Sequence, residues 1–481
     1  MAPRHPRLTH ACTTAIIPAL ARALAVTAVA AAAVPLLWAS PSGGVAGDVD
    51  GDRGVGDPYF PTAGNGGYDV EHYGLELDYV PATRALTGVA TISATAEEDL
   101  RSFSLDLRGL SVTAVSVDEE EAEYRQDGSE LVISPEARPR DGEEFTTVVR
   151  YGGTTGQPVD TVGGFYGWVS TSDGAFVANE PDGAPTWFPA NDHPTDKATY
   201  DFAITVPTGS TAVANGDLVD RTESAGTTTY RWSAKEPMAS YLATASVGDY
   251  DLLTSETSGG LPLIDAVDRD LPREQATAGL VRTGEMVEVF TDRFGTYPFS
   301  SFGSIIDDDT LADYALETQT RPIYSGPPPE STVAHELAHQ WFGNAVSPAS
   351  WRDIWLNEGF ATYGEWLWIE YAGGATVQQS FDKAYAVPAG EEFWTVAPAD
   401  PGAKNMFSGA VYGRGAMTLV SLRAEIGEEE FTTLLRRWYT ENRDGDASTA
   451  DFTELAEEVS GRSLEDFFTA WLTTPAKPAM G

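Results

Sequence analysis

Residues 331–366 read "STVAHELAHQWFGNAVSPASWRDIWLNEGFATYGEW" and contain two short motifs. The first is His-Glu-x-x-His at residues 335–339, and the second is Asn-Glu-Gly at residues 357–359. The chain has only 6 histidines among its 481 residues, so two of them in this pattern are very improbable by chance. The two motifs are therefore expected to form one site.

The residue types and their spacing point to a metal ion. Residues four positions apart lie on the same face of a helix, so His335 and His339 can direct two imidazole nitrogens at one ion. Glu336 can reach a water molecule on that ion without binding the ion itself. A catalytic zinc ion takes three protein ligands and keeps a fourth position open. Glu358, on a second helix that begins near Leu356, is the predicted third ligand.

Upstream of these motifs, the sequence predicts an all-β domain. From Tyr68 to about Leu253 apolar and polar residues alternate, and turns with glycine or proline occur at frequent intervals, which is typical of short strands. The apolar members of three such runs are Leu75, Leu77 and Tyr79, then Phe103, Leu105 and Leu107, then Tyr200, Phe202, Ile204 and Val206. We expect this domain to cover residues 68–255.

After Ser258–Pro262 the apolar residues recur with the period of a helix. The first predicted helix lies within residues 273–295 and ends at Gly295. The motif helix is expected to be capped by Ser331 or Thr332 and ended by Gly343. The motif helix is predicted over Ser331–Phe342. The helices predicted after it are about Leu356–Tyr371, Ser408–Ile426, Glu428–Tyr439 and Thr449–Val459. A mainly helical domain is therefore expected over residues 256–474, with a tail over 475–481.

The N-terminal part of the chain is typical of a signal peptide, predicted over residues 1–40. Arg4, Arg7 and Arg22 precede the apolar run Ala23–Trp38, which small residues follow. An uncleaved membrane anchor is the alternative, although the run is short for a bilayer and interrupted by Pro35. Residues 41–67 are rich in glycine, aspartate and proline and are expected to form a flexible lead-in.

Composition excludes several classes of function. The formal net charge is −42, and such a field repels nucleic acid and anionic lipid. The single cysteine, Cys12, lies before the apolar run. Once a signal peptide is removed, no cysteine remains for thiol catalysis, for cysteine-ligated zinc or for a disulfide. The acidic chain fits a secreted protein with no nucleic-acid partner.

The two motifs also carry a family resemblance. "HELAHQWFG" and "NEGFATYGE" resemble the aminopeptidase N family of zinc metallopeptidases, which belong to the gluzincins, and the similarity runs from Gly64–Tyr79 to Leu464–Pro478. Thermolysin-like endopeptidases are similar too, but their glutamate comes one residue later. The resemblance implies an α+β multidomain fold, with a saddle-like β sandwich before a mainly helical, thermolysin-like catalytic domain. Because the sequence ends soon after Trp471, it implies a short, secreted bacterial-type member without the large C-terminal helical domain.

The resemblance implies further site residues. "YALETQTRPIYS" (Tyr314–Ser325) stands where the family has Gly-Ala-Met-Glu-Asn, which makes Glu317 the residue that binds the substrate's free amine. "NEPDGAPTWFPANDHPTDKATYDF" carries over a second amine-binding acid, Glu180, and "VYGRGAMTL" carries over Tyr412 as the donor to the reacting carbonyl oxygen. The chain departs from the family pattern at four positions near the amine. These positions are Tyr314, Leu316, Thr318 and Ala178.

Together, the motifs and the resemblance imply a secreted zinc aminopeptidase with one Zn²⁺ per chain on His335, His339 and Glu358. A zinc-activated water would attack the first peptide bond, with Glu336 as general base. Glu365 is a further candidate, one that orients a zinc-binding histidine. The expected partners are peptides with a free N-terminus; neither stable membrane insertion after signal cleavage nor an obligate protein partner is implied. The alternatives are a thermolysin-like endopeptidase and a non-catalytic peptide-binding module.

Overall fold

The computed structural model describes residues 48–156, 166–308 and 315–480, all within one compact unit that spans Gly47–Gly481. The predicted signal peptide, Cys12 and the first residues of the predicted lead-in lie outside the described residues. Among the described helices, none combines the length and the apolar character needed to span a bilayer.

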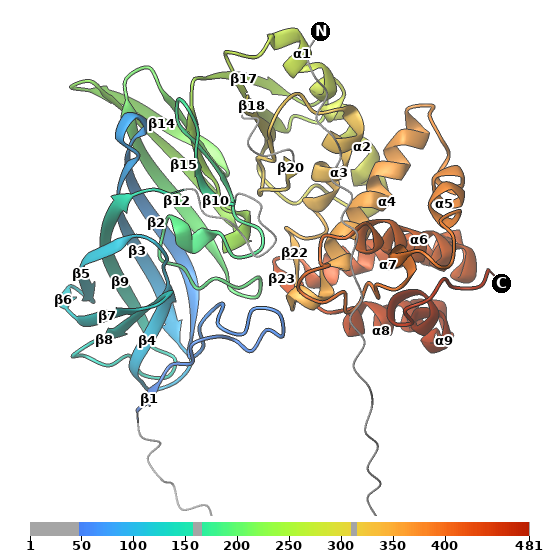
Figure 1. Ribbon diagram of the computed structural model, residues 1–481, viewed down its shortest axis with the longest axis horizontal. Helices are drawn as coiled ribbons and strands as arrows, with labels where there is room; N and C mark the ends of the chain where they lie inside the picture. The colour runs from blue at the N-terminus through green and yellow to red at the C-terminus, as the bar shows by residue number, and fades with distance from the viewer. Residues whose placement is uncertain (1–47, 157–165, 309–314, 481) are drawn as a thin grey trace, which may run out of the picture. The chain divides into compact units, whose positions relative to one another are not determined.

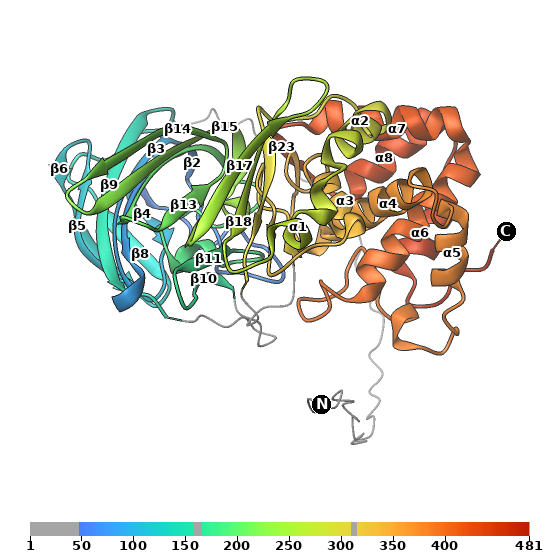
Figure 2. The same ribbon diagram turned by 90° about the horizontal axis from the view of Figure 1, so that it is seen from above.

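The N-terminal part is built around an eight-stranded sheet, drawn in blue and green in Figures 1 and 2. Strands β2 and β12 pair in parallel, and the other neighbours in this sheet are antiparallel. In sheet order the strands are β14 (Asp217–Ser224), β15 (Thr227–Ala239), β12 (Lys197–Pro207), β2 (Tyr68–Val80), β3 (Ala85–Ala96), β9 (Glu144–Thr154), β5 (Ser111–Val117) and β6 (Glu120–Glu121).

Two four-stranded sheets complete this β-rich part. The first runs β1 (Val49–Asp50), β4 (Leu100–Asp106), β8 (Glu130–Ser134) and β7 (Glu123–Asp127). The second runs β10 (Gly167–Ser170), β11 (Ala175–Ala178), β16 (Ala245–Gly248) and β13 (Thr211–Ala214). The apolar members of all three quoted runs are buried. The predicted alternation is confirmed in β2 and β12, where one face of each strand supplies the core, whereas in β4 the polar residues Ser104 and Asp106 are buried as well.

A five-stranded mixed sheet follows and leads into the helices. Its order is β17 (Tyr250–Glu256), β18 (Pro262–Asp268), β19 (Phe302–Ile306), β21 (Ile323–Tyr324) and β20 (Ala315–Leu316). The predicted domain boundary at residue 255 falls inside β17, which pairs along its whole length with β18. The sequence analysis did not predict this sheet, and its edge strand β20 ends directly before Glu317.

The rest of the chain is mainly helical, so the prediction of a β-rich part followed by a helical part is confirmed. The helices are α1 (Arg273–Ala276), α2 (Thr283–Phe294), α3 (Glu330–His339), α4 (Trp355–Tyr371), α5 (Val377–Tyr385), α6 (Gly409–Ile426), α7 (Glu428–Asn442), α8 (Thr449–Ser460) and α9 (Glu465–Phe468). A short parallel pair, β22 (Val346–Pro348) and β23 (Gly445–Ala447), joins the exit of α3 to the loop after α7.

The described part of the predicted lead-in contacts both halves of the chain through Asp57. Asp57 is buried, and its carboxylate accepts hydrogen bonds from the N–H groups of Tyr59 and Phe60. It also accepts from the Ser350 hydroxyl and the Trp351 N–H, each at 2.9 Å. These last two residues begin the short 3-10 turn Trp351–Asp353 that leads into α4, so the segment is attached close to the element that carries Glu358.

We expect Asp57→Asn to lower the free energy of unfolding at pH 7 by about 1.5–3 kcal/mol, the range for hydrogen bonds to a charged group. Burial alone would raise the pKa of Asp57, but the hydrogen bonds from His193 and from the N–H groups of Trp351, Phe60 and Tyr59 hold it below its usual range. The stabilisation is therefore present above the ordinary carboxyl pKa of about 3.9 and is lost as the pH falls further.

Urea unfolding of parent and variant, with a chelator present, measures this difference at pH 7 and at about pH 3. Asp220→Asn, at an exposed aspartate on β14, is the matched control and should change little at either pH. An Asp57→Asn variant as stable as the parent at pH 7 would show that the segment adds no stability.

Candidate active site

Helix α3 presents His335, Glu336 and His339 from one short element. The two imidazole ring centroids lie 4.8 Å apart, as expected for residues one turn apart. The predicted caps, Ser331 and Thr332, are wrong, because both lie inside the helix and its N-cap is Pro329 in an extended conformation. The helix ends at His339, before the predicted Phe342, and Gly343 follows with φ of +118°.

Helix α4 places Glu358 against both histidines. Its Oε2 atom lies 3.2 Å from Nε2 of His335 and 3.5 Å from Nε2 of His339. These three side chains each offer one ligand atom, and the three atoms lie within 4.8 Å of one another. Glu358 and His339 are buried, so the three atoms converge in a place with little competing water.

The orientation of the two rings fits a zinc ion. Nδ1 of His339 lies 3.1 Å from the carbonyl oxygen of Phe342 and can donate its proton there, which leaves the lone pair on Nε2 for a metal. Nδ1 of His335 lies 3.8 Å from the Glu365 carboxylate, the residue that the sequence suggested for this role. Two imidazole nitrogens and one carboxylate oxygen are the ligand set of many catalytic zinc sites.

The local electrostatics favour a bound cation. Burial raises the pKa of Glu336 to about 7, although the neighbouring histidines pull it down. Burial would also raise the pKa of Glu358, but the charge of His339 and the hydrogen bond with His335 lower it to about 2. Glu358 is therefore ionised across the physiological range, and an ion in this cluster would be held by a negative ligand.

Helix α6 adds Tyr412, whose ring stacks on that of His335 with centroids 6.0 Å apart. Burial and the Glu358 charge raise the pKa of Tyr412 well above its ordinary value, so the hydroxyl stays protonated and can donate. Helices α4 and α6 lie side by side in Figures 1 and 2. Glycine at positions 359 and 415 permits this close approach, since a Cβ atom at Gly359 would lie only 2.9 Å from Cα of Gly415.

Two further carboxylates complete the cluster, and they come from opposite halves of the chain. Glu317 follows β20, and Glu180 follows β11 of the β-rich part. Each offers one carboxylate oxygen, and these two oxygens and one of Glu358 lie within 4.8 Å of one another. Oε1 of Glu180 and Oε1 of Glu317 are buried and accept no hydrogen bond from any described residue. Burial raises the pKa of both groups, and repulsion by Glu317 raises that of Glu180 further.

Three of the four positions at which the chain departs from the family pattern lie near Glu180 and Glu317 in the sequence. Ala178 is buried at the end of β11 and contributes no polar atom, whereas the hydroxyl of Thr318 donates to the carbonyl oxygen of Arg321 inside its own turn. Leu316 is buried in β20. Tyr314 lies outside the described residues.

Comparison with models of protein families identifies the family of the chain. A model of the Peptidase M1 N-terminal domain matches residues 69–242, and a model of the Peptidase family M1 domain matches residues 314–471. The chain belongs to peptidase family M1. The two matches cover the β-rich part and the helical part, including His335, His339 and Glu358.

The most similar curated relatives of this M1 peptidase include glutamyl aminopeptidase from Bos taurus, 28% identical over 85% of this chain and 47% of the relative. Aminopeptidase N from Lactobacillus delbrueckii subsp. lactis is 26% identical over 86% of this chain and 52% of the relative. The chain therefore spans about half the length of these relatives.

Solved structures match over their whole length. A variant of the M1 zinc metallopeptidase from Deinococcus radiodurans, bound to a Tyr-Ser-Ala substrate, superposes with a TM-score of 0.81 at 29% identity, over 89% of this chain and 100% of that one. A two-domain M1 zinc metallopeptidase variant bound to L-tryptophan matches equally well, with a TM-score of 0.81 at 29% identity and the same coverage. The two-part fold is thus that of a two-domain M1 metallopeptidase.

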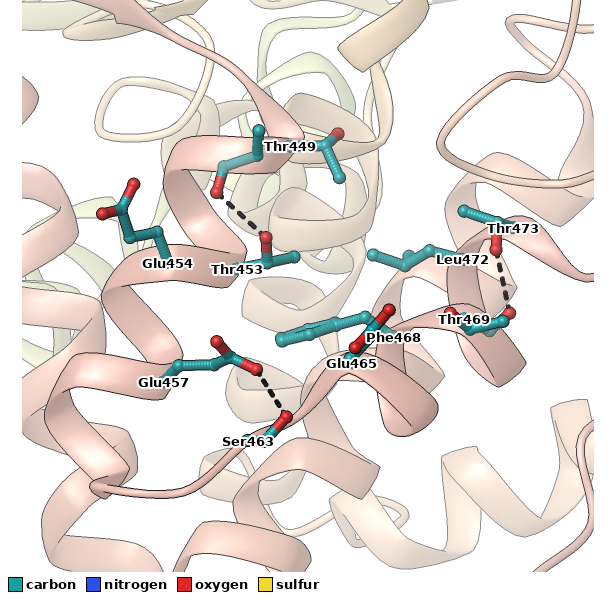
Figure 3. Close-up of a pocket in the computed structure, with 11 residues that line it drawn as sticks. Thr449, Thr453, Glu454, Glu457, Ser463, Glu465, Phe468, Thr469, Leu472 and Thr473 are labelled. Carbon is teal, nitrogen blue, oxygen red and sulfur yellow. Dashed lines mark hydrogen bonds between the residues drawn. The ribbon is translucent and has the colours of Figure 1, made fainter.

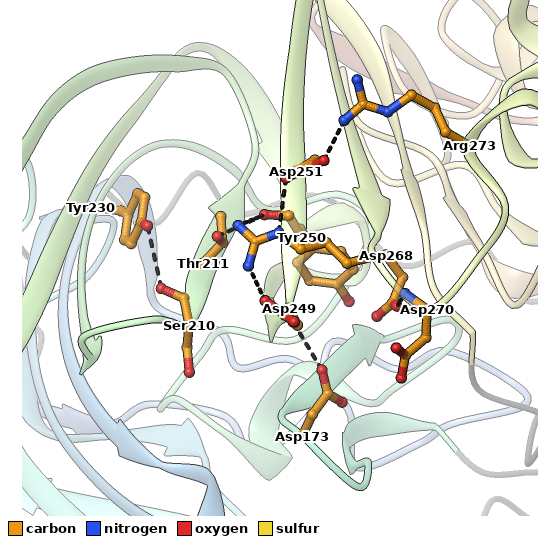
Figure 4. Close-up of polar contacts among 11 residues, drawn as sticks. Asp173, Ser210, Thr211, Tyr230, Asp249, Tyr250, Asp251, Asp268, Asp270 and Arg273 are labelled. Carbon is orange, nitrogen blue, oxygen red and sulfur yellow. Dashed lines mark hydrogen bonds and ion pairs between the residues drawn. The ribbon is translucent and has the colours of Figure 1, made fainter.

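A second acidic cluster in this M1 chain has different chemistry. Asp268, Asp270 and Asp308 each bring a carboxylate oxygen within 4.8 Å of the others, and Figure 4 shows the first two side by side. Oδ1 of Asp268 accepts the N–H of Asp270 at 2.7 Å. This set offers only oxygen ligands, which zinc does not prefer, so it does not compete with the histidine cluster as the M1 zinc site.

A hollow at the C-terminal end of the M1 chain also lacks the required groups. It has a volume of about 490 Å³ and lies between α8 and the segment with α9 and the short π-helix Thr469–Thr473 (Figure 3). Its lining residues include three glutamates, Glu454, Glu457 and Glu465, but no histidine. The histidine-containing candidate metal site among the described residues is therefore the one at α3 and α4.

Three residues that the sequence did not single out, Gly415, Gln340 and Asn344, shape the M1 site without being predicted metal ligands. Gly415 permits the close approach of α6 to α4. The feature of the sequence that could have indicated this is the pair of glycines, Gly413 and Gly415, directly after Tyr412. Gln340 and Asn344 contact the segment with Glu317. Gln340 directly follows the His-Glu-x-x-His motif and Asn344 comes four residues later, but their partners are distant in sequence.

Proposed function

We propose that this protein is a zinc-dependent aminopeptidase that removes the N-terminal residue of peptides. The observation that carries the proposal is the pair of buried carboxylate oxygens, on Glu180 and Glu317, that have no hydrogen-bond partner among the described residues and lie beside the His335, His339 and Glu358 cluster. Buried polar atoms are nearly always paired, so these two are poised for a group that the peptide brings.

His335, His339 and Glu358 would hold the zinc ion. When bound, zinc supplies a Lewis acid that polarises the scissile carbonyl and the attacking water. Glu336 takes a proton from that water and passes it to the leaving amine. Tyr412 donates its hydroxyl to the oxyanion that develops on the carbonyl.

Glu180 and Glu317 would make the enzyme an exopeptidase. The metal chemistry alone cleaves any peptide bond that is placed correctly, so another group must select the first bond. A free α-amine is cationic near neutral pH and would form charge-assisted hydrogen bonds with both carboxylates. Their fixed distance from His335, His339 and Glu358 then places the first carbonyl at the zinc. The Tyr-Ser-Ala peptide bound by the similar structure supports a short peptide as substrate.

We also propose that the protein is exported. Arg4 and Arg7 precede the apolar run Ala23–Trp38, which is the order found in signal peptides. The absence of acidic residues before Asp48, in a chain with 72 of them, supports the same assignment. N-terminal sequencing of protein recovered from the culture medium would test it.

We expect Glu317→Gln and Glu180→Gln each to lower kcat/KM for an aminoacyl-amide substrate by about 10- to 10³-fold, mainly through KM. Each variant removes one charge that holds the amine but leaves the predicted zinc ligands in place. Steady-state kinetics with free and N-acetylated substrates, together with zinc analysis, measure the effect.

The matched control is Glu130→Gln. Glu130 is likewise buried and without a hydrogen-bond partner among the described residues, but it lies in β8. Its variant should keep the parent's kinetics. If Glu317→Gln cleaves an N-acetylated peptide at an internal bond as well as the parent does, the thermolysin-like endopeptidase is the better assignment. If the zinc-loaded parent cleaves no peptide at all, the non-catalytic peptide-binding module is the better assignment.

A further inference from the structure

The segment that carries Glu317 is a buried turn with a strained residue. All five residues from Glu317 to Arg321 are buried. Thr320 has φ of +63°, in the left-handed region that branched side chains rarely adopt. A backbone conformation of this kind persists only where the surroundings hold it firmly.

Two side chains from the exit of α3 hold this turn. Gln340 is the residue after His339, and its Oε1 accepts the N–H of Thr320 at 2.9 Å. Its Nε2 donates to the carbonyl oxygen of Glu317 at 3.3 Å and to that of Glu336 at 3.2 Å. Asn344 donates from Nδ2 to the same Glu317 carbonyl oxygen at 2.7 Å. One glutamine therefore bonds to both Glu336 and Glu317.

The β-rich part holds the other side of the turn. Nδ2 of Asn215 donates to the carbonyl oxygens of Leu242 and Gln319, and the N–H of Gly216 donates to the Thr320 hydroxyl at 2.8 Å. The turn is thus fixed on both sides, and Gln340 and Asn344, just past the end of α3, donate the hydrogen bonds that the Glu317 carbonyl oxygen accepts from that side.

We propose that Gln340 and Asn344 are positioning residues that set the distance between Glu317 and the metal-ligating face of α3. This inference rests on the proposed function, in which Glu317 binds the substrate amine. In a bound peptide, the length of one amino-acid residue separates the amine from the first carbonyl. The side-chain amides of Gln340 and Asn344 would keep Glu317 and the metal-ligating face of α3 at the matching distance. Oε1 of Glu317 lies 3.8 Å from Nδ1 of His339, so a small shift of the turn changes this distance substantially.

A positioning role predicts a specific kinetic signature. Loss of the amides leaves His335, His339 and Glu358 unchanged, so zinc should stay bound. The amine-binding carboxylate moves, and a displacement of about 1 Å can cost roughly 100-fold in catalysis. Gln340→Met should therefore raise KM for a free aminoacyl amide by about 10- to 100-fold while zinc remains stoichiometric.

A double-mutant cycle separates positioning from general destabilisation. If Gln340 acts through Glu317, then Glu317→Gln should cost much less in kcat/KM in the Gln340→Met background than in the parent. Two residues that act independently would give effects that multiply. Asn344→Leu removes the other hydrogen-bond donor to the Glu317 carbonyl oxygen. This variant replaces Gln340→Met in the test if Gln340→Met does not fold.

Gln319→Met is the matched control. Gln319 is buried in the same turn, but its Nε2 faces the carbonyl oxygens of Glu236 and Pro237 in the β-rich part. We expect its KM to stay within about threefold of the parent value. An unchanged KM in both Gln340→Met and Asn344→Leu, or fully multiplicative effects in the cycle, would overturn the inference. A parent that is inactive on free-amine substrates would instead overturn the proposed function, whatever these variants do.

Discussion

Glu336→Gln is expected to retain zinc and to lose about 10²–10⁴-fold in kcat, the range for a positioned proton-transfer group. Glu336 lies on α3 between the two histidines, and its carboxylate converges with the Glu317 carboxylate and the His339 ring, but it is not one of the three predicted ligands. Glutamine has nearly the same volume and keeps an acceptor oxygen, but it cannot take up a proton near neutral pH. The buried side chain should therefore stay in place while proton transfer fails.

Elemental analysis and steady-state kinetics on the same preparation measure both parts of this expectation. Glu330→Gln is the matched control, because Glu330 begins the same helix but is partly exposed and pairs with Arg282 at 3.5 Å. That variant should keep both zinc and rate. A Glu336→Gln protein with the parent's kcat would remove Glu336 from the proton-transfer role.

His339→Ala is expected to lose both zinc and activity. The change removes one of three ligand atoms and leaves only His335 and Glu358, which do not complete a zinc site. Without the metal, the remaining groups supply little of the rate enhancement, so kcat/KM should fall by roughly 10⁴-fold or more. Metal content by mass spectrometry and hydrolysis of an aminoacyl amide measure the two losses.

His193→Ala is the control for this variant. His193 is equally buried, but it lies beside Asp57, with Nε2 at 3.4 Å from the carboxylate. Its replacement should lower stability and leave zinc content unchanged. Stoichiometric zinc in His339→Ala would contradict the assignment of the metal site.

The local features of the site could be predicted from the sequence because they depend on spacing within single elements. The interval between His335 and His339 specifies one face of α3, and the apolar period gave α4 and α6 to within about a turn. The start of α3 was misplaced because Pro329, which has no side-chain cap, precedes the helix, so the serine and threonine that follow lie within it.

Features that depend on partners far away in the chain could not be predicted. Strands β20 and β21 have two residues each and show no periodicity of their own. They exist because β19 offers a buried parallel edge. Asp57 lies in a stretch with the composition of a flexible linker, yet its partners Ser350 and Trp351 make it part of the core.

The residues near Glu317 illustrate the same limit. The sequence suggested that Thr318 and Ala178 alter how the amine is held, and both are buried near the predicted acids. No pattern in the sequence indicated that the Gln340 side chain bonds to the backbone of Glu317 and Thr320, because these residues lie at a helix exit and in a turn rather than in one periodic element.

Product analysis of one peptide in two forms, with and without an N-acetyl group, tests the aminopeptidase assignment most directly. Zinc-loaded protein is incubated with each form, and the products are identified by mass spectrometry. We expect the free peptide to lose residues one at a time from its N-terminus and the acetylated peptide to remain intact. Cleavage of the acetylated peptide at an internal bond, at a rate similar to that of the free form, would contradict the assignment.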